Sequence, residues 1–451
     1  MKRGAALLLL ALGAAACAPA REQPRARNVI LLSIDTLRAD HLQTWGYDRP
    51  TSPFLTSLAE RGTVFLAAYS QAPWTLPSHA SLLMSRAPSS LGKGVWERPH
   101  RLPESAVSIA EVLHDAGLRT HAVVNGGFVS ATFGLGQGFE EYDEHDRRTA
   151  ATVRRAGRWL ETLAPDERFF LFLHTYEVHE YDPPPEVAAE FAHLYSGYLD
   201  ELGDQLPRFV QDREMDSDLP DLDEAARQHV VDLYDAGIRS VDDAVAELWA
   251  LLEERGLVDD TLLVVTSDHG EELFEHGGTG HGYTLHDENT HVPLILVGAG
   301  LPARRVSQQV RLLDVSPTLA ELAGVPAPPE WEGVSLLRVL EGDTTPRPAF
   351  SEQAHHPFVS LRLAGPTGTL KYIRGADGGQ LYDLAADPGE EHDLAGHAPA
   401  EADLRGQLDA WIVAHDAWPP PSGSGPPQLE DELLDQLRRL GYVGADEEDE
   451  E

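Results

Sequence analysis

Four short, continuous runs of apolar residues constrain the fold of this chain more than any other feature. Their hydrophobicity is unbroken rather than alternating, which is typical of strands that are covered on both faces. Amphipathic segments separate the runs, and this alternation indicates an α/β protein with a mostly parallel sheet. The predicted strands are Val29–Ile34, His121–Val124, Phe169–Leu173 and Leu262–Thr266.

Two helices and two further strands are predicted outside these runs. Each helix ends at or just before a glycine, the residue that most easily adopts the left-handed conformation of a helix C-terminus. Beyond about residue 330 the pattern changes to short strands and turns. These segments are the helices Ala106–Ala116 and Val241–Glu254 and the strands Thr369–Ile373 and Gln380–Asp383.

The first residues predict export. Two basic residues precede an apolar run that is too short for a bilayer, which takes about 20 residues, but has the size of a signal peptide. The run ends in three alanines before Cys17, the only cysteine in the sequence, and this resembles a bacterial lipobox. We therefore predict a signal peptide at 1–16, a lipid on Cys17 and a tether at 17–27. The protein would be a periplasmic or cell-surface lipoprotein that meets the membrane through its lipid alone; ordinary cleavage near the alanines is the alternative.

Composition divides the rest of the chain. The strand and helix pattern places the main domain at 28–330, and the change of pattern places a smaller subdomain at 331–418. Within the main domain, 183–227 is rich in Pro, Asp and Glu and weakly periodic, which predicts an insertion or lid at the mouth of a site. Residues 419–451 comprise a Pro/Gly/Ser linker, a short amphipathic helix predicted at Leu429–Leu440 and a tail too acidic to fold.

The charge of the chain excludes one class of partner. The sequence holds 35 Lys and Arg residues against 74 Asp and Glu residues, a net charge of −39. A surface this acidic repels the phosphate backbone, so we expect no nucleic acid partner. Hydrophobic residues make up 42% of the chain, which is enough for a globular core.

Polar residues follow each predicted strand at its carboxyl end. Ligands of open parallel sheets bind beyond these ends, because parallel strands bring them to one edge. Two carboxylates, an imidazole and an amide converging there predict a site for a metal and an anion, although any one of them alone is also explained as a turn residue. The residues are Asp35, Asn125, His174 followed by His179, and Asp268 with His269.

A hydroxyl group completes this predicted site. The segment Trp74–Leu83 (WTLPSHASLL) is predicted to begin a helix with Thr75 as its N-cap. A helix N-terminus offers unpaired N–H groups and a partial positive charge, which suit an anion. A hydroxyl that touches a metal there could ionise and attack phosphorus or sulfur. Without the metal, Thr75 would simply cap the helix.

Six blocks of sequence, in family order from about residue 28 to 395, resemble the sulfatase family of the alkaline phosphatase superfamily. The resemblance implies an α/β fold with a mixed sheet sandwiched by helices and a smaller C-terminal sheet subdomain. It also implies transfer of a sulfuryl or phosphoryl group to a metal-activated nucleophile, with a small-molecule, glycan or lipid-head-group ester as substrate. The blocks are Asn28–Leu42, Ala72–Met84, Ser267–Glu272, His291–Ile295, Asp314–Gly324 and Leu381–Glu390.

The resemblance assigns roles to individual residues. Its metal ligands fall on Asp35, Thr75, Asp268 and His269, and Thr75 is also its nucleophile. The catalytic residue facing the substrate oxygens falls on His179, and the one over the leaving group falls on His281. Substrate-binding positions fall on Asn125 and on His79.

Two departures separate this chain from the family's sulfatases. Those enzymes oxidise a Cys or Ser to formylglycine, whereas this sequence has Thr75, which cannot form that aldehyde. They also hold calcium with a second Asp and an Asn, and here Thr36 and His269 take these positions. Losing a carboxylate and gaining an imidazole moves the preference from calcium to zinc or manganese. In both respects the chain is more similar to phosphonate monoester hydrolases and phosphoethanolamine transferases.

These observations predict an exported hydrolase or transferase that cleaves phosphate or phosphonate esters through Thr75, with one divalent metal and no formylglycine. Two alternatives stay open: a true sulfuric ester hydrolase, and an inactive surface-anchored binding protein that keeps the fold. The remaining histidines of the region, His276, His286 and His291, are explained as a polar loop at the rim. Asp242 and Asp243 are predicted to be surface or structural residues.

Overall fold

The computed structural model describes residues 25–92, 100–146, 148–191, 199, 206, 209–210, 222–353, 358–365, 368–375, 378–416, 427–440 and 442. Several predictions fall mostly or wholly outside the described residues: the signal peptide at 1–16, a lipid on Cys17, the tether at 17–27, the lid at 183–227 and the acidic tail. None of the helices within the described part of the chain combines the length and the apolar character that crossing a membrane requires.

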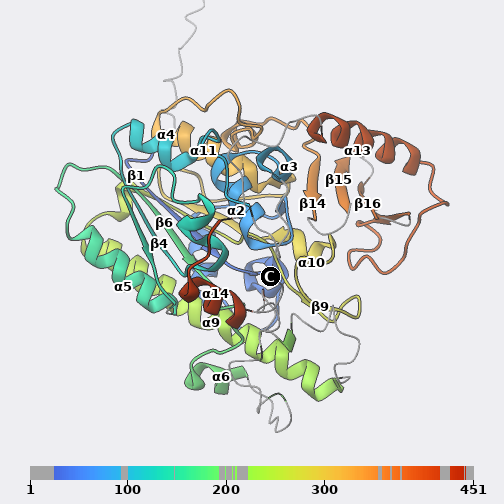
Figure 1. The fold of residues 1–451 in the computed structure, drawn as a ribbon, viewed down its shortest axis with the longest axis horizontal. Helices are drawn as coiled ribbons and strands as arrows, with labels where there is room; N and C mark the ends of the chain where they lie inside the picture. The colour runs from blue at the N-terminus through green and yellow to red at the C-terminus, as the bar shows by residue number, and fades with distance from the viewer. Residues whose placement is uncertain are drawn as a thin grey trace, which may run out of the picture.

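An eight-stranded mixed sheet forms the centre of the protein (Figure 1). Its order is β12-β2-β11-β7-β1-β6-β4-β5, with β11 antiparallel to both of its neighbours and the other pairs parallel. The four predicted strands are confirmed as β1, β4, β6 and β7, each longer by one or two residues. The strands are β1 Asn28–Ile34, β2 Thr63–Phe65, β4 Arg119–Val124, β5 Glu141–Glu144, β6 Phe169–Thr175, β7 Thr261–Thr266, β11 Leu294–Val297 and β12 Arg304–Val306.

The unbroken apolar runs are explained by two hydrophobic cores, one on each face of this sheet. Along β1, Val29 and Leu31 join one core, and Ile30 and Leu32 join the other. Alternate side chains of a strand point to opposite faces, so a strand covered on both sides needs an apolar residue at every position. The first core includes helices α2 Thr75–Met84, α4 Ile109–Asp115 and α11 Val315–Ala323, and the second includes α1 Pro53–Arg61, α5 Thr149–Leu160 and α9 Glu224–Glu254.

Both predicted helices form, with different bounds. Helix α4 begins three residues later than predicted because Ser108 caps it, in a reciprocal capping box with Glu111. The helix predicted at Val241–Glu254 is the second half of α9, which extends back to Glu224 and is capped by Asp223. The segment predicted as an insertion therefore ends inside a long helix. It also contains α6 Pro185–Phe191.

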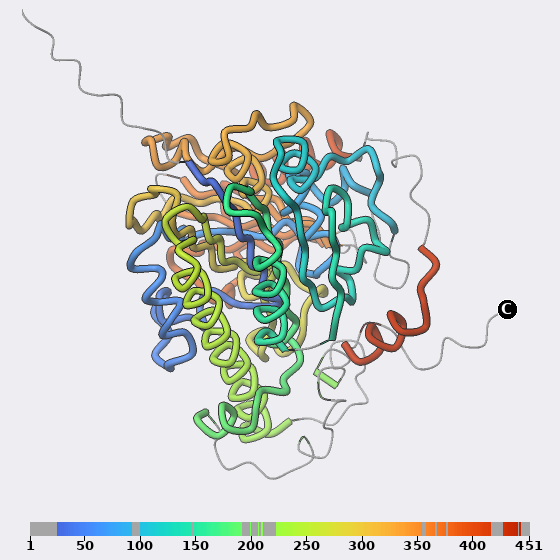
Figure 2. The backbone as a smooth tube through the Cα atoms, turned by 90° about the vertical axis from the view of Figure 1, so that its left-hand side faces the viewer, coloured from blue at the N-terminus to red at the C-terminus, as the bar shows by residue number. Residues whose placement is uncertain are grey.

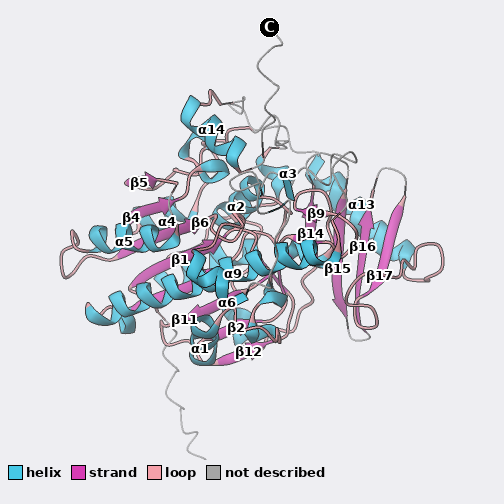
Figure 3. Ribbon diagram, turned by 90° about the horizontal axis from the view of Figure 1, so that it is seen from below, coloured by secondary structure: helices cyan, strands magenta, loops and turns pink. Residues whose placement is uncertain are grey.

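A smaller antiparallel sheet follows the main domain, as predicted (Figure 3). Helix α13 Glu401–Asp416 packs against its two central strands, and the subdomain has its own core around Leu361, Tyr372 and Leu408. The mixed sheet between helices and this second sheet together confirm the predicted fold class. The strands are β14 Ala349–Glu352, β15 Val359–Gly365, β16 Gly368–Arg374 and β17 Gly379–Asp383.

Several short elements connect these layers. Strands β3 Ala68–Tyr69, β10 His291–Val292 and β13 Val310–Arg311 form a three-stranded sheet, and β8 Glu272–Leu273 pairs with β9 Thr279–Gly280. The remaining helices include α3 Pro88–Leu91, α10 Asp287–Thr290, α12 Leu337–Leu340 and α14 Asp431–Arg439. Figures 1 and 2 show α14, in dark red, apart from the C-terminal sheet. It lies instead against the main domain, where it contacts the 3₁₀ turn Gly127–Val129 that follows β4.

The two aspartates predicted to be surface or structural residues divide between these roles. Asp242 is buried on α9, and its carboxylate accepts hydrogen bonds from the backbone N–H of Phe54 and of Leu55, at 2.8 and 2.7 Å. It thereby caps α1, whose own N-cap residue forms no side-chain cap. Asp243 is exposed and pairs with Arg239 at 3.0 Å.

We expect Asp242→Ala to lower the free energy of unfolding by about 1–3 kcal/mol, because two N–H groups at the start of α1 lose their acceptor. Urea denaturation followed by circular dichroism measures this. Asp243→Ala is the matched control, and its effect should stay within about 0.5 kcal/mol because exposed ion pairs contribute little. Equal effects of the two substitutions would contradict the capping role.

Candidate active site

The ends of neighbouring strands bring two carboxylates and an imidazole together. β1 and β7 run parallel with Ser33 opposite Thr266, so the residues that follow them meet at one edge of the sheet. These residues are Asp35 after β1 and Asp268 and His269 after β7, and all three are fully buried. The sequence pattern predicted this meeting from the strand ends alone.

Thr75 joins this group from the first position of α2. The N-cap is Trp74 rather than Thr75, so the prediction that Thr75 caps the helix is wrong by one residue. Its hydroxyl faces the strand ends instead: Oγ1 lies 3.3 Å from Asp35 Oδ2 and 3.4 Å from His269 Nε2. The hydroxyl of Ser78 donates to the backbone oxygen of Asp268 at 2.6 Å and fixes the start of α2 against the end of β7.

The electrostatics of this group call for a positive charge. Burial raises the pKa of Asp268 to about 7, and burial together with the charges of Asp268 and Glu271 raises the pKa of Asp35 well above its usual value. His174 Nε2 lies 3.4 Å from Asp35 Oδ2, but burial lowers the pKa of this histidine, so it stays neutral. Neither carboxylate forms an ion pair with Lys or Arg among the residues that the structure describes.

His269 directs a lone pair into the group. Its Nδ1–H donates to the backbone oxygen of Gly270 at 2.8 Å, which leaves Nε2 unprotonated. This Nε2 lies 3.3 Å from Asp268 Oδ2 and 3.4 Å from Thr75 Oγ1. The Nε2 lone pair and the carboxylate oxygen of Asp268 repel at this distance unless a cation or a proton lies between them, whereas the Thr75 hydroxyl has a hydrogen to donate.

The spacing of the donor atoms fits a metal ion. Four donors at the corners of a tetrahedron, each about 2.0–2.1 Å from a zinc ion, lie about 3.3–3.4 Å from one another. The three donor–donor distances given above fall within that interval. Asp35, Asp268 and His269 are also one of three groups of described residues whose ligand atoms are close enough to hold a metal ion.

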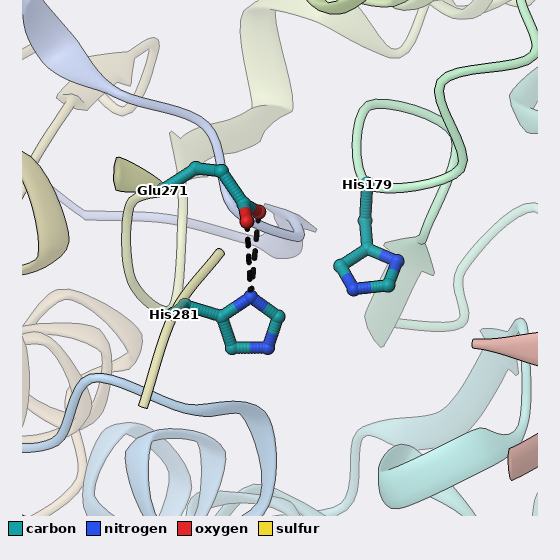
Figure 4. Close-up of side chains that lie close together, drawn as sticks. All are labelled: His179, Glu271 and His281. Carbon is teal, nitrogen blue, oxygen red and sulfur yellow. Dashed lines mark hydrogen bonds and ion pairs between the residues drawn. The ribbon is translucent and has the colours of Figure 1, made fainter. Parts of the chain in front are cut away.

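A second group lies beside the first and consists of His179, Glu271 and His281 (Figure 4). Glu271 contacts the ring of His281, with Oε2 3.3 Å from Nδ1, and the His281 ring lies 4.5 Å from that of His269. Burial raises the pKa of Glu271 to about 7 and lowers those of His179 and His281 to about 3. The sequence analysis missed Glu271, although it stands two residues after His269 in the motif SDHGEE.

The third group is explained without a metal. His276 Nδ1 lies 2.6 Å from Glu288 Oε1, and this hydrogen bond raises the pKa of His276 to about 9. The ring of His286 stacks on that of His276 at 3.8 Å. The ion pair between His276 and Glu288 accounts for the charged side chains of this group, which agrees with the interpretation of this stretch as a polar loop.

The two residues predicted to bind substrate are both buried. His79 Nδ1 bonds to the backbone oxygen of Thr75 at 2.9 Å, closer than its 3.3 Å separation from Asp268 Oδ2, and its Nε2 lies 3.0 Å from Ser33 Oγ. Burial lowers the pKa of His79 to about 4, so the ring is neutral. Asn125 Nδ2 donates to the backbone oxygen of His145 at 3.3 Å. Their contact with substrate stays a prediction.

Tyr442 enters the site from the C-terminal end of the chain. Its hydroxyl lies 3.2 Å from Thr75 Oγ1 and 3.1 Å from His281 Nε2, and its ring stacks on that of His179 with centroids 5.6 Å apart. No local signal could have identified this residue, because it follows the predicted linker and lies 161 positions from His281. Together the groups bring a hydroxyl, three residues that could hold a metal ion and a pair of imidazoles into contact, which is an arrangement that group transfer could use.

Comparisons with known proteins identify similar sequences and similar folds. A family model described as Sulfatase matches residues 27–325. Arylsulfatase K of Mus musculus is 24% identical over 443 residues, which cover 83% of this chain and 78% of that protein. Among solved structures, a 2-O GAG sulfatase superposes with a TM-score of 0.68 at 22% identity, covering 87% of this chain and 93% of the other. The phosphonate monoester hydrolase of Agrobacterium radiobacter superposes with the same TM-score, 0.68, at 18% identity, covering 87% and 96%.

Proposed function

The chain belongs to the sulfatase family of ester hydrolases in the alkaline phosphatase superfamily, and we propose that it cleaves phosphate or phosphonate esters with Thr75 as the nucleophile. One observation carries this proposal. The hydroxyl at the start of α2 is a threonine, and it lies within 3.4 Å of both a strand-end carboxylate and the Nε2 lone pair of His269. Threonine cannot become formylglycine, so the hydroxyl itself has to attack.

One divalent ion would be held by Asp35, Asp268, His269 and Thr75. Calcium takes six to eight oxygen ligands, whereas this set mixes two carboxylates and a hydroxyl with an imidazole, which favours zinc or manganese. When bound, such an ion lowers the pKa of a hydroxyl ligand and offsets charge on the oxygens of the substrate. The buried carboxylates, which lack a Lys or Arg partner among the described residues, support this assignment.

The side chains would then divide the reaction between them. Thr75 Oγ1 gives its proton to the carboxylate of Asp35, which accepts its hydrogen bond, and forms a bond to phosphorus, while the bond from phosphorus to the leaving oxygen breaks. The N-terminal end of α2 stabilises negative charge on the transferred group. The negative charge of the bound ester raises the pKa of His281 from its lowered value, so that the ring becomes charged and donates the proton at Nε2 to the leaving oxygen, while Glu271 accepts from Nδ1–H and stabilises the charged ring. Water, or an acceptor alcohol in a transferase, then releases the group from Thr75.

The fold does not choose between sulfur and phosphorus, because it is shared by sulfatases and phosphonate monoester hydrolases. The nucleophile supports phosphorus. A sulfated formylglycine hydrate can expel sulfate by elimination, whereas a sulfated threonine has to wait for water to attack sulfur. The change of metal ligand at His269 is a second, independent reason.

A sulfate ester hydrolase is the second candidate. The resemblance to arylsulfatase K over 83% of this chain favours it. An inactive binding protein is disfavoured, because the acids, the hydroxyl and the imidazoles of a group-transfer site are all present and in contact.

We expect protein purified without chelators to hold about one equivalent of zinc or manganese per chain, measured by mass spectrometry of the metals. Asp268→Asn should lose most of this metal, because a charged ligand becomes a neutral amide. It should also lose the rise in melting temperature that added metal gives the unsubstituted protein. His114→Ala, at a half-exposed position on α4, is the control and should keep both. Full metal content in Asp268→Asn would reject the assigned site.

We expect Thr75→Ala to lower the turnover of an aryl phosphodiester by about 10³-fold or more, because the attacking oxygen is removed. Metal content should be largely retained through the other three ligands, and Thr75→Ser should keep measurable turnover. Steady-state kinetics with matched phenyl phosphodiester, phosphonate and sulfate substrates provide the measurement. Unchanged turnover in Thr75→Ala would exclude this nucleophile. Faster cleavage of the sulfate than of the diester would instead favour the second candidate.

We expect Glu271→Gln to lower kcat about 10²-fold for an ester of phenol and much less for the ester of nitrophenol. A good leaving group needs less help from an acid, and Glu271 acts by positioning His281. Glu272→Gln is the matched control, since that carboxylate accepts from the backbone N–H of His276 and of Gly278. An equal loss with both esters would show that Glu271 acts through stability rather than through His281.

A further inference from the structure

Tyr442 occupies space that a substrate needs. A nucleophile attacks an atom that lies about 3–3.5 Å away. The phenol oxygen lies 3.2 Å from Thr75 Oγ1, within that interval, and 3.1 Å from His281 Nε2. The reacting group of an ester and the phenol of Tyr442 therefore cannot be bound at the same time. With Tyr442 in place, Thr75 and His281 are 0% and 1% exposed.

The contacts of the Tyr442 phenol are those expected for the aromatic alcohol that an aryl ester releases. Its ring lies 4.7 Å from that of Phe128, 5.6 Å from that of His179 and 5.7 Å from that of His281. Burial and the charge of Asp35 raise the pKa of Tyr442, so the hydroxyl is neutral. With His281 Nδ1 donating to Glu271, Nε2 accepts from this hydroxyl. The phenol thus resembles the free alcohol of an aryl ester after cleavage.

Helix α14 carries Tyr442 to the site by docking on the loop after β4. Leu433, Leu437 and Leu440 are buried in the core shared with α2 and α4. The Gln436 side chain accepts from the backbone N–H of Gly127 at 2.9 Å and donates to the backbone oxygen of Asn125.

The loop is shaped to receive this helix. A Cβ on Gly126, whose φ is +67°, would lie 2.5 Å from the amide oxygen of Gln436. Gly127 has a φ of +55°, and a Cβ there would meet the Tyr176 side chain at 2.8 Å and the Leu440 side chain at 3.0 Å. Both glycines combine the left-handed backbone with a close approach of α14.

The docking is opposed by charge. A cavity of about 330 Å³ lies between α14 and the body of the protein, and acidic residues face it from both sides. Glu430 and Glu432 belong to the C-terminal segment, and Glu144 and Asp146 to the body. The exposed pair of Arg439 with Asp146, at 3.7 Å, offsets part of this repulsion. The sequence before α14 has the Pro/Ser/Gly composition of a flexible linker. Helix α14 can therefore leave the site without moving the rest of the chain.

We propose that α14 and Tyr442 form a displaceable C-terminal cap that inhibits the enzyme by placing the Tyr442 phenol where the leaving group of an aryl ester binds. This inference rests on the proposed function, since it names the leaving-group class of the same site. Aryl esters displace the cap best, because their ring takes over the contacts with Phe128, His179 and His281.

The first test uses the full-length, metal-loaded protein and a phenyl phosphodiester. Tyr442→Ala and Leu437→Asp should each raise kcat/KM by about tenfold or more, mainly by lowering KM. The reason is that the apparent affinity for substrate is proportional to the fraction of enzyme that is uncapped, and both substitutions raise that fraction. Asp435→Ala lies on the exposed side of α14 and is the matched control, with unchanged kinetics. A fall in kcat at constant KM in Tyr442→Ala would overturn the cap and place Tyr442 in the catalytic machinery.

The second test reads the cap without turnover. Hydrogen exchange of the α14 amides in the metal-loaded protein should speed up when phenylphosphonate, a stable aromatic probe, is added, and should already be fast in Leu437→Asp. Inorganic phosphate is the comparison and should release α14 less, because it lacks the ring. Exchange that is slow and insensitive to phenylphosphonate would overturn the proposal. If phenylphosphonate releases α14 while no ester is cleaved by any variant, the cap stands and the proposed function fails.

Discussion

Two carboxylates buried side by side set the terms for the rest of this structure. Asp35 and Asp268 are fully buried at the ends of adjacent strands, and burial raises the pKa of both. Placing two such groups together is costly unless a cation compensates them. The apolar strands β1, β6 and β7 hold them there, because both faces of these strands are buried against helices. The tight packing of the sheet is therefore what keeps the two carboxylates together at its edge.

The sequence was most informative where structure follows from a local pattern. Continuous apolar runs predicted β1, β4, β6 and β7, and the residues after these strands predicted where Asp35 and Asp268 meet. Both inferences depend on the geometry of parallel strands, which hydrophobicity reveals. The C-terminal sheet followed in the same way from short strands separated by turns.

Other parts of the site could not be predicted because they depend on contacts between distant segments. The N-cap moved from Thr75 to Trp74 because the Thr75 hydroxyl bonds to Asp35 and His269 instead of to its own helix. Glu271 contacts His281 only when the loop carrying His281 folds back beside it. Tyr442 reaches Thr75 across a sequence separation of 367 residues, which no periodicity records.

The C-terminal cap follows from the same constraint as the site. A neutral phenol seals the buried carboxylates from water without adding charge, and the charge of Asp35 in turn raises the pKa of that phenol. An ester that displaces the phenol carries its own negative charge into the site, so it needs the cation that we propose for the two carboxylates. Release of the cap and binding of substrate are thus coupled through the same group of charges. Acidic residues on both sides of the α14 interface keep the docking weak enough for a substrate to compete.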